Sequence, residues 1–176
     1  MMESIFWGPA LIGYLVKCLN EKFPDNLVGK TVVQKMMYLL IREGVGDFRY
    51  SMYHYGPYSS AVSGELNFAE SSEIVDINWI EEKGYSIKPG STLSKFEDLL
   101  TEEDKEKVNE ISVKFGKFNA GALSLIATAL FLEDNYDVAA DELPQLVHRL
   151  KEKYDVSYIK KILKEAEIIE DISVPF

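Results

Sequence analysis

Residues 30–66 constrain the fold more than any other part of the chain, because different periodicities follow one another there without a long linker. Apolar residues recur at helical spacing over 31–43 and then alternate with polar residues over 48–55. Gly56 and Pro57 follow and predict a turn, since glycine tolerates unusual dihedrals and proline fixes its own φ. Ser59 or Ser60, shortly after this turn, can cap another helix by accepting one of its free N–H groups. The stretch therefore predicts a helix, a strand, a turn and a second helix in succession.

The helix predicted over 31–43 has an apolar arc wide enough to be largely buried. The arc consists of Val32, Val33, Met36, Met37, Leu39, Leu40 and Ile41. Thr31 is placed to cap the N-terminus of this helix. The other side carries Gln34, Lys35, Tyr38 and Arg42. We expect the polar edge formed by Gln34, Lys35 and Arg42 to face outward.

The rest of the chain predicts a mostly helical α+β fold. Apolar residues over 73–79 and 82–88 predict a β-hairpin. Capping signals and periodicity then predict helices that begin at Thr101, Asn119, Asp141 and Ser157, with Leu150 pointing inward. We expect one domain over residues 1–176, in which helices surround a small antiparallel sheet or hairpin. A Pro-Gly-Ser sequence suggests a soft junction near 89–100, between a mixed N-terminal half and an all-helical C-terminal half.

The charge of the chain limits the classes of partner. Its 176 residues carry a formal net charge of −10. An acidic protein gains no general attraction to a phosphate backbone, so nucleic acid binding would need a local basic surface. No apolar run reaches the length of a membrane helix, and the N-terminus lacks the basic segment of a secretion signal. Cys18 is the one cysteine, which excludes an internal disulfide framework. These features indicate a cytoplasmic protein.

The sequence offers few parts for catalysis. His54, His148 and Cys18 have no spacing that pairs a nucleophile with a base. Nothing resembles a metal-ligand motif, so we expect no metal and no cofactor. Cys18 lies on the apolar stripe of a predicted helix and is expected in the core. The acidic run over 133–137 lacks the glycine and the distal glutamate of a calcium loop, and we interpret it as an exposed connection.

Two motifs in residues 30–66 resemble a known family. The run Gln34-Lys35-x-x-Tyr38-Leu39-Leu40 is followed by Tyr55-Gly56-Pro57-Tyr58-Ser59. This combination resembles the YwgA-like family and the related SocA-like antitoxin (Panacea) domain. The resemblance implies that Tyr38, Tyr55, Gly56, Pro57 and Ser59 shape the fold. It also implies a role, because SocA-like proteins bind a toxin, and one branch delivers that toxin to a protease as an adaptor. YwgA-like members have no established activity.

We therefore expect a non-catalytic module that binds a protein partner. The resemblance implies an antitoxin-like or adaptor role, with a toxin encoded nearby as the partner. Tyrosines in the 48–58 segment offer large amphipathic contact area at low entropic cost. The expected contact residues are Gln34, Lys35, Arg42, Arg49, Tyr53 and Tyr58.

Two alternatives stay open. The helical pair over 141–169 could be the DNA-binding hairpin of a transcriptional regulator, with Lys160, Lys161 and Lys164 on its outward arc. The neighbouring Glu165 and Glu167 disfavour this alternative, as does the lack of Arg, Asn or Gln for base contacts. An enzyme of unknown reaction is the second alternative. The sequence also leaves a homo-oligomer open.

Overall fold

The computed structural model describes residues 5–54 and 56–170. Within them the fold is α+β and mostly α, as the sequence predicts, with two separate two-stranded antiparallel sheets. The helices are α2 (Trp7–Lys22), α3 (Lys30–Arg42), α4 (Ser60–Ser71), α5 (Leu93–Phe96), η1 (Glu97–Leu99), α6 (Glu102–Phe115), α7 (Ala120–Tyr136), η2 (Ala140–Glu142), α8 (Leu143–Leu150) and α9 (Val156–Glu165). The strands are β1 (Ser51–Tyr53), β2 (Gly56–Tyr58), β3 (Val75–Ile80) and β4 (Gly84–Pro89).

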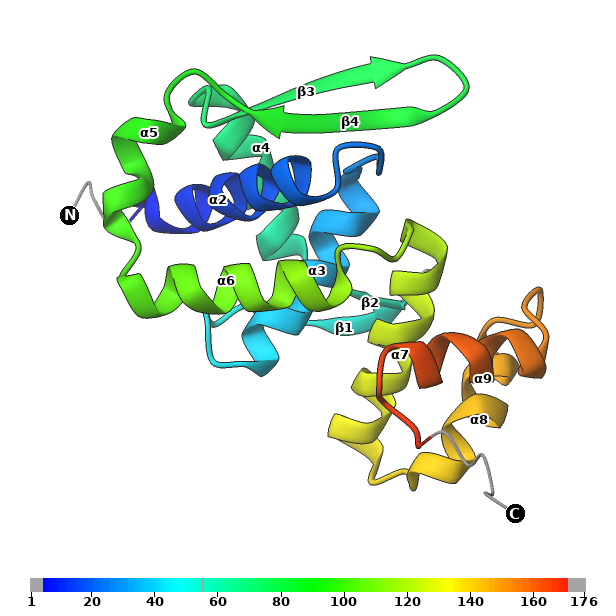
Figure 1. Cartoon of the computed structure of the whole chain (residues 1–176). Coiled ribbons are helices and arrows are strands. Elements are labelled where there is room, and N and C mark those ends of the chain that lie inside the picture. The colour runs from blue at the N-terminus through cyan, green and yellow to red at the C-terminus, as the bar shows by residue number, and fades with distance from the viewer. Residues whose placement is uncertain (1–4, 55, 171–176) are drawn as a thin grey trace.

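Helix α2 forms the centre of the larger part of the molecule. Figure 1 shows α4 and the β3–β4 hairpin on one side of it and α6 on the other, and all of them contact α2. Leu11, Ile12 and Leu15 have no exposed surface, and Cys18 is buried as expected. Burial of a side chain the size of leucine contributes about 1.5–3 kcal/mol. This helix therefore carries a large share of the core.

Helix α3 packs against α6 and α7, and its apolar arc is buried as predicted, apart from the half-buried Ile41. The predicted cap is wrong, because Gly29 is the N-cap and Thr31 lies inside the first turn. The N–H of Ile87 in β4 donates to the carbonyl of Val28 at 2.8 Å. This bond fixes the chain immediately before the helix. The helix begins at Lys30, one residue before the predicted range of 31–43.

The predicted strand over 48–55 is shorter than expected, and the predicted Gly-Pro turn is wrong. Gly56 and Pro57 lie in β2, which pairs with β1 so that Met52 faces Pro57 and Tyr53 faces Gly56. Gly56 has a φ of +103°, which bends the chain at the start of the strand without a side-chain clash. Proline is tolerated here because a strand of an isolated pair has a free edge. Tyr55 lies outside the described residues.

The β3–β4 hairpin and the segment after it follow the predictions closely. Val75 pairs with Pro89 and Ile80 with Gly84, within one or two residues of the expected strands. The suggested junction over 89–100 carries α5 and η1, and both pack on α2. Elements from both sides of that segment therefore share one core.

Three of the predicted caps are confirmed. Ser59 Oγ accepts from the Val62 N–H, Thr101 forms a capping box with Asp104, and Asn119 Oδ1 accepts from the Ala122 N–H. Each bond satisfies an N–H that the first turn of a helix leaves without a partner.

The last two helices differ slightly from the predictions. Asp141 lies in η2 rather than at the start of α8, and α9 begins at Val156 rather than Ser157. Leu150 was expected to point inward but is 51% exposed. It is the last residue of α8, and the chain turns away at Lys151, so Leu150 lies beyond the surface that the neighbouring helices cover.

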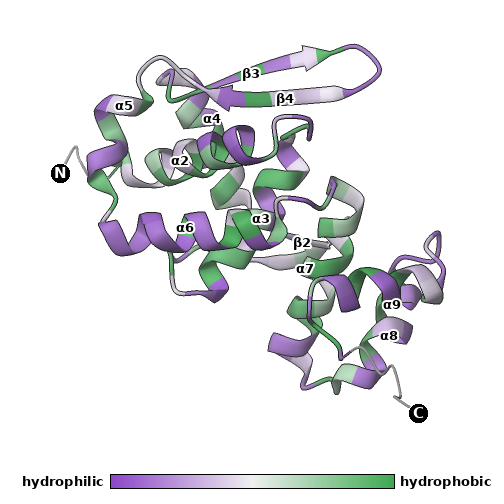
Figure 2. Ribbon diagram, in the orientation of Figure 1, coloured by the Kyte–Doolittle hydropathy of each residue, from purple (hydrophilic) through white to green (hydrophobic). Residues whose placement is uncertain are grey.

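Helix α7 links the two ends of the molecule. It packs against α3 and β2 on one side and against α8 and α9 on the other, and Figure 1 shows α8 and α9 on the far side of α7 from α2. Figure 2 shows hydrophobic residues concentrated along α2, α3 and α7. Among the described residues, no single helix combines the length and apolar composition of a membrane span; α6 and α7 reach them only as a pair bent by 113°.

Candidate functional site

The β1–β2 hairpin is held on α3 by buried polar side chains. Gln34 Nε2 donates to the Ser59 carbonyl at 2.8 Å, and the Ser59 N–H donates to Gln34 Oε1 at 3.0 Å. The Tyr50 hydroxyl donates to the Gln34 carbonyl at 2.9 Å. Gln34 is only 6% exposed, so its predicted outward position is wrong. Its amide instead satisfies backbone groups at the end of β2 that no neighbouring strand reaches.

Lys35 lies beneath the same hairpin, and its predicted outward position is also wrong. It is 2% exposed, and Nζ donates to the Pro57 carbonyl at 3.0 Å. Burial, together with the positive charge of Lys151, lowers the pKa of Lys35 to about 8. The backbone of β2 therefore covers the helix face that local periodicity assigns to solvent.

Gly56 lies directly on α7. A Cβ at this position would come within 2.6 Å of Thr128 Oγ1 and 3.3 Å of the Ser124 carbonyl oxygen. Thr128 is fully buried, and its Oγ1 has no hydrogen-bond partner among the described residues. Contacts to Gly56, Pro57 and Ser59 thus hold the hairpin between α3 and α7.

Aromatic rings of the hairpin line a cavity between the hairpin and α3. Tyr53 is 62% exposed, and its ring centroid lies 5.5 Å from that of the half-buried Tyr58 and 5.0 Å from that of the exposed His54. These residues line a cavity of about 270 Å³ together with Lys30 and Lys35. We call this surface the hairpin groove. Arg49 is exposed two residues before β1, as expected.

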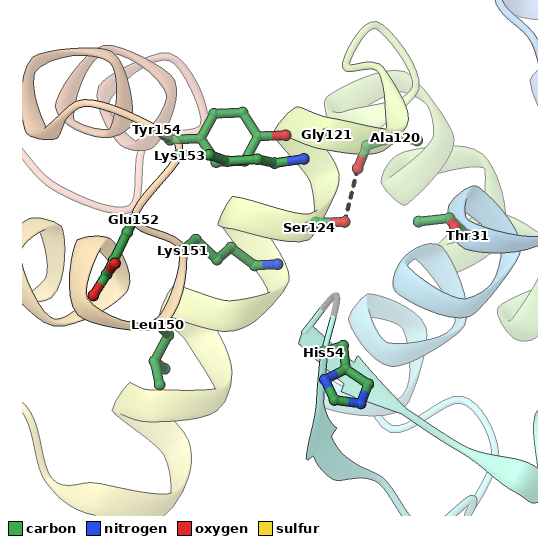
Figure 3. Close-up of a pocket in the computed structure, with 10 residues that line it drawn as sticks. All are labelled: Thr31, His54, Ala120, Gly121, Ser124, Leu150, Lys151, Glu152, Lys153 and Tyr154. Carbon is green, nitrogen blue, oxygen red and sulfur yellow. Dashed lines mark hydrogen bonds between the residues drawn. The ribbon is translucent and has the colours of Figure 1, made fainter.

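A larger cavity of about 490 Å³ lies between the hairpin, the start of α7 and the loop that joins α8 to α9. We call it the α7 pocket. Figure 3 shows Lys151 and Lys153 directed into it and Glu152 directed away, and the Ser124 hydroxyl on α7 donates to the Ala120 carbonyl. Burial, and then the charge of Lys153, lower the pKa of Lys151.

An adjoining cavity of about 360 Å³ extends the α7 pocket toward β2. It shares His54, Leu150 and Lys151 with that pocket and adds Gly56 and Thr128 to the lining. Sequence reasoning placed none of Lys151, Lys153, Tyr154 and Thr128 in a pocket. These residues meet because α8 and α9 fold back on α7, and no local pattern reports that contact.

The remaining expected contact residue, Arg42, is held in an ion pair on another side of α3. Its Nε and Nη2 donate to Asp134 Oδ2 and Oδ1 at 2.7 and 3.0 Å, and the Tyr38 hydroxyl donates to Oδ2 at 2.8 Å. Burial alone would raise the pKa of Asp134, but the bonds from Arg42 and Tyr38 hold it below its ordinary value. The acidic run is exposed, as expected, but it is not a connection: residues 133–136 form the last turn of α7, and Asp134 ties α7 to α3.

Two of the three catalytic candidates have other partners, whereas His54 lines the hairpin groove and the α7 pocket. Cys18 is buried, which raises the pKa of its thiol, and Sγ donates to Asn109 Oδ1 at 3.5 Å. His148 Nδ1 lies 2.7 Å from the Tyr154 carbonyl. No group of three or more His, Cys, Asp or Glu residues in the described part of the chain could hold a metal ion.

The lysines of the DNA-binding alternative lie on α9. Lys160 and Lys161 are exposed, Lys164 is half-buried, and Glu165 and Glu167 are exposed beside them. The positive charge on this face is therefore partly offset by carboxylates.

Comparison of the sequence with protein-family models finds no match, and comparison with curated proteins finds no significant match.

Proposed function

We propose that this chain is a non-catalytic module that binds a protein partner through the hairpin groove. The observation that carries the proposal is the exposure of Tyr53 beside Tyr58 on a hairpin whose backbone is fixed from below by Gln34 and Lys35. Tyrosine contributes large contact area with little loss of side-chain entropy, and a fixed backbone lowers the ordering cost of binding.

Charge supports a partner with an acidic segment. Lys30 lines the hairpin groove, and its Nζ lies 4.0 Å from the ring centroid of Tyr85. Exposed Arg49 adds a second cation near β1. On a chain of net charge −10, this local basic surface would orient an acidic patch of a partner and speed its association.

The kind of partner follows from the resemblance to Panacea-domain antitoxins. We propose a toxin-like protein encoded beside this chain in a cytoplasmic system, which this chain neutralises or delivers to a protease. The arrangement in the structure gives the shared motif a physical role, since Gln34 and Lys35 hold the backbone of Pro57 and Ser59.

The test is binding to the purified products of the adjacent reading frames, measured by isothermal titration calorimetry. A Tyr53→Ala plus Tyr58→Ala variant should keep the wild-type circular dichroism and lose about tenfold or more in affinity. Tyr136→Ala is the matched control, because Tyr136 is 64% exposed at the far end of α7. Binding that survives the double variant, or that the control abolishes equally, would exclude the hairpin groove. No binding by wild type, with turnover of a small molecule instead, would overturn the proposal.

DNA binding by α9 is the second candidate, favoured by the exposure of Lys160 and Lys161 on adjacent positions. A DNA-binding protein of this kind would retain a promoter duplex at about 100 mM salt. A Lys160/Lys161/Lys164 triple alanine variant would weaken this retention and make it less dependent on salt. We expect no retention by wild type. Specific retention that the triple variant abolishes would reverse the ranking of the two candidates.

A further inference from the structure

Lys35 carries a buried positive charge without an acidic partner. It is 2% exposed, and Nζ donates to the Pro57 carbonyl at 3.0 Å. Within residues 5–54 and 56–170, no Asp or Glu forms an ion pair with it. An ammonium group has three donors, and buried charges in proteins are usually paired. Lys35 therefore has the capacity for an anionic partner that the described residues do not supply.

The charged end of Lys35 lies at the wall of the hairpin groove. Lys35 and Gly56 both line this cavity of about 270 Å³. A Cβ on Gly56 would lie 3.6 Å from Lys35 Cε, so the carbon that bears the ammonium group is next to a residue of the cavity wall. An anion in the groove would therefore lie within reach of that ammonium group.

The hairpin groove has the size of a site for one side chain. Its volume is below the roughly 300–1,000 Å³ of pockets that enclose drug-sized ligands. Tyr53, His54 and Tyr58 line it with ring surface, against which the methylene groups of a side chain can pack. A carboxylate side chain combines such an apolar stem with a charged end.

The charges of the hairpin groove favour a carboxylate over a phosphate. Lys30 and Lys35 line the groove, and its lining in the described part of the chain includes no Asp or Glu. A carboxylate matches the single charge of Lys35, whereas a phosphate carries about −1.5 to −2 and has oxygens that one ammonium group cannot satisfy. Burial, and then the charge of Lys151, lower the pKa of Lys35, and a bound carboxylate would raise it.

We infer that Lys35 binds the carboxylate of a glutamate or aspartate side chain, which the partner inserts into the hairpin groove beside Tyr53 and Tyr58. This role rests on the proposed function and names the chemical group that the groove recognises. Lys30 attracts acidic segments in general, whereas buried Lys35 contacts only a side chain that enters the cavity. A neutral side chain there would cover the Lys35 charge without pairing it, so Lys35 determines specificity.

The first test adds two matched probes to the full chain, N-acetyl-glutamate methylamide and N-acetyl-glutamine methylamide, which differ only in a carboxylate against an amide. We expect the glutamate probe to bind about tenfold or more tightly than the glutamine probe. It should also raise the pKa of Lys35, followed by NMR of the ¹³C-labelled Cε atom. The Cε signal of Lys160, exposed on α9, is the internal control and should respond to neither probe. Equal binding of the probes, or a Lys35 titration that the glutamate probe leaves unchanged, would overturn the inference.

A pair of variants locates the carboxylate. Lys35→Met should abolish the preference for the glutamate probe, because it removes the charged donor. Lys160→Met should keep the preference. A preference that persists in Lys35→Met would place the carboxylate elsewhere and overturn the inference. Lys35→Met also loses the bond to the Pro57 carbonyl, but the Lys35 titration in wild type decides the question even where the variant fails to fold.

The same titration in the complex separates the role of Lys35 from the proposed function. When the product of an adjacent reading frame binds, we expect the pKa of Lys35 to rise. A partner that only covers the groove would desolvate Lys35 and lower its pKa, so the direction of the change is decisive. Binding with an unchanged or lowered pKa would overturn the inference and leave partner binding standing. If no product binds, the proposed function fails, and the preference between the two probes decides whether Lys35 binds a carboxylate.

Discussion

The side-chain amide of Gln34 and the backbone of Ser59 bond to each other in both directions, at 2.8 and 3.0 Å. Ser59 also caps α4 through its hydroxyl, so this one residue joins α3, the end of the β1–β2 hairpin and the start of α4. The hairpin has only two short strands, and an isolated two-stranded hairpin is at best marginally stable in water. Its fixed position therefore depends on these bonds from α3.

Gln34→Ala should destabilise the protein by about 2–4 kcal/mol, because it removes two hydrogen bonds and leaves buried Ser59 backbone groups without partners. Urea denaturation followed by circular dichroism measures the change. Gln145→Ala is the control, since Gln145 is exposed on α8, and should cost under about 0.5 kcal/mol. Equal losses in the two variants would show that the hairpin does not depend on Gln34.

A comparison of Gly56→Ala with Gly84→Ala separates the cost of backbone strain from the cost of crowding by a neighbouring side chain. The two glycines have φ values of +103° and +101°, so alanine is strained by about 1–2 kcal/mol at either. Only at Gly56 would the new Cβ meet another residue, Thr128 Oγ1 at 2.6 Å; nothing lies within 4 Å at Gly84.

We expect Gly56→Ala to lower the free energy of unfolding by about 1–3 kcal/mol more than Gly84→Ala, as overpacking does in other cores. Thermal melts of both variants measure the difference. Adding Thr128→Ala should restore part of the loss in Gly56→Ala and none in Gly84→Ala. Indistinguishable melting temperatures for the two glycine variants would show that α7 yields to the added methyl group.

The parts of the fold that sequence predicts best are those set by neighbouring residues. The caps at Ser59, Thr101 and Asn119 each depend on a side chain and an N–H within three residues, so a local pattern contains all the information. The buried arc of α3 is equally predictable, because a helical repeat of apolar residues reports its own burial.

Positions that depend on distant contacts were not predictable in this way. Gln34 and Lys35 are polar residues at helical spacing, which is typical of an exposed edge, yet the chain 22–25 residues later covers them. A useful signal was present: their neighbours in sequence are almost all apolar, so the helix has little face left for solvent. The α7 pocket gave no such signal, because its lysines come from a loop that meets α7 only through the packing of α8 and α9.

The ion pair between Arg42 and Asp134 should show modest, salt-dependent coupling. Both side chains are about one-third exposed, at 28% and 33%, so solvent screens the pair. A double-mutant cycle with Arg42→Ala and Asp134→Ala should give a coupling energy of about 1 kcal/mol at low salt, because the contact is bidentate, and less at high salt. Coupling unchanged in about 1 M salt would indicate a pair shielded from solvent.

The lowered pKa of Asp134 predicts that the protein loses stability in acid. Because the folded-state pKa of Asp134 lies below its ordinary value, its contribution to stability is present above the unfolded pKa of about 4 and is lost as pH falls through the folded value. The stability difference between wild type and Asp134→Ala should therefore shrink as pH drops below about 4. Denaturation midpoints measured at a series of acidic pH values give this difference. A constant difference would exclude the ionised Asp134 as its source.

Lys35 predicts a second rise of stability with pH, in the alkaline range. Its pKa in the folded protein is about 8, against an ordinary value of 10.5. Below pH 8 both states hold the proton, and the buried charge lowers stability. Between about 8 and 10.5 the folded state has released the proton while the unfolded chain keeps it, so stability rises with pH.

Lys35→Met removes this rise, and it also removes the hydrogen bond to the Pro57 carbonyl, which lowers stability at every pH. From pH 7 to about 10, wild type should therefore gain a few kcal/mol relative to the variant, roughly 1.4 kcal/mol per pH unit through the interval. Urea denaturation at each pH measures both proteins. Burial also raises the pKa values of Tyr38 and Tyr50. Both tyrosines are present in wild type and in the variant, so their contributions to the pH dependence cancel when the two proteins are compared. Lys160→Met, at an exposed site on α9, is the control, and its free energy of unfolding should change with pH as that of wild type does. If Lys35→Met also shows the wild-type pH dependence, the Lys35 ammonium stays charged beneath the hairpin.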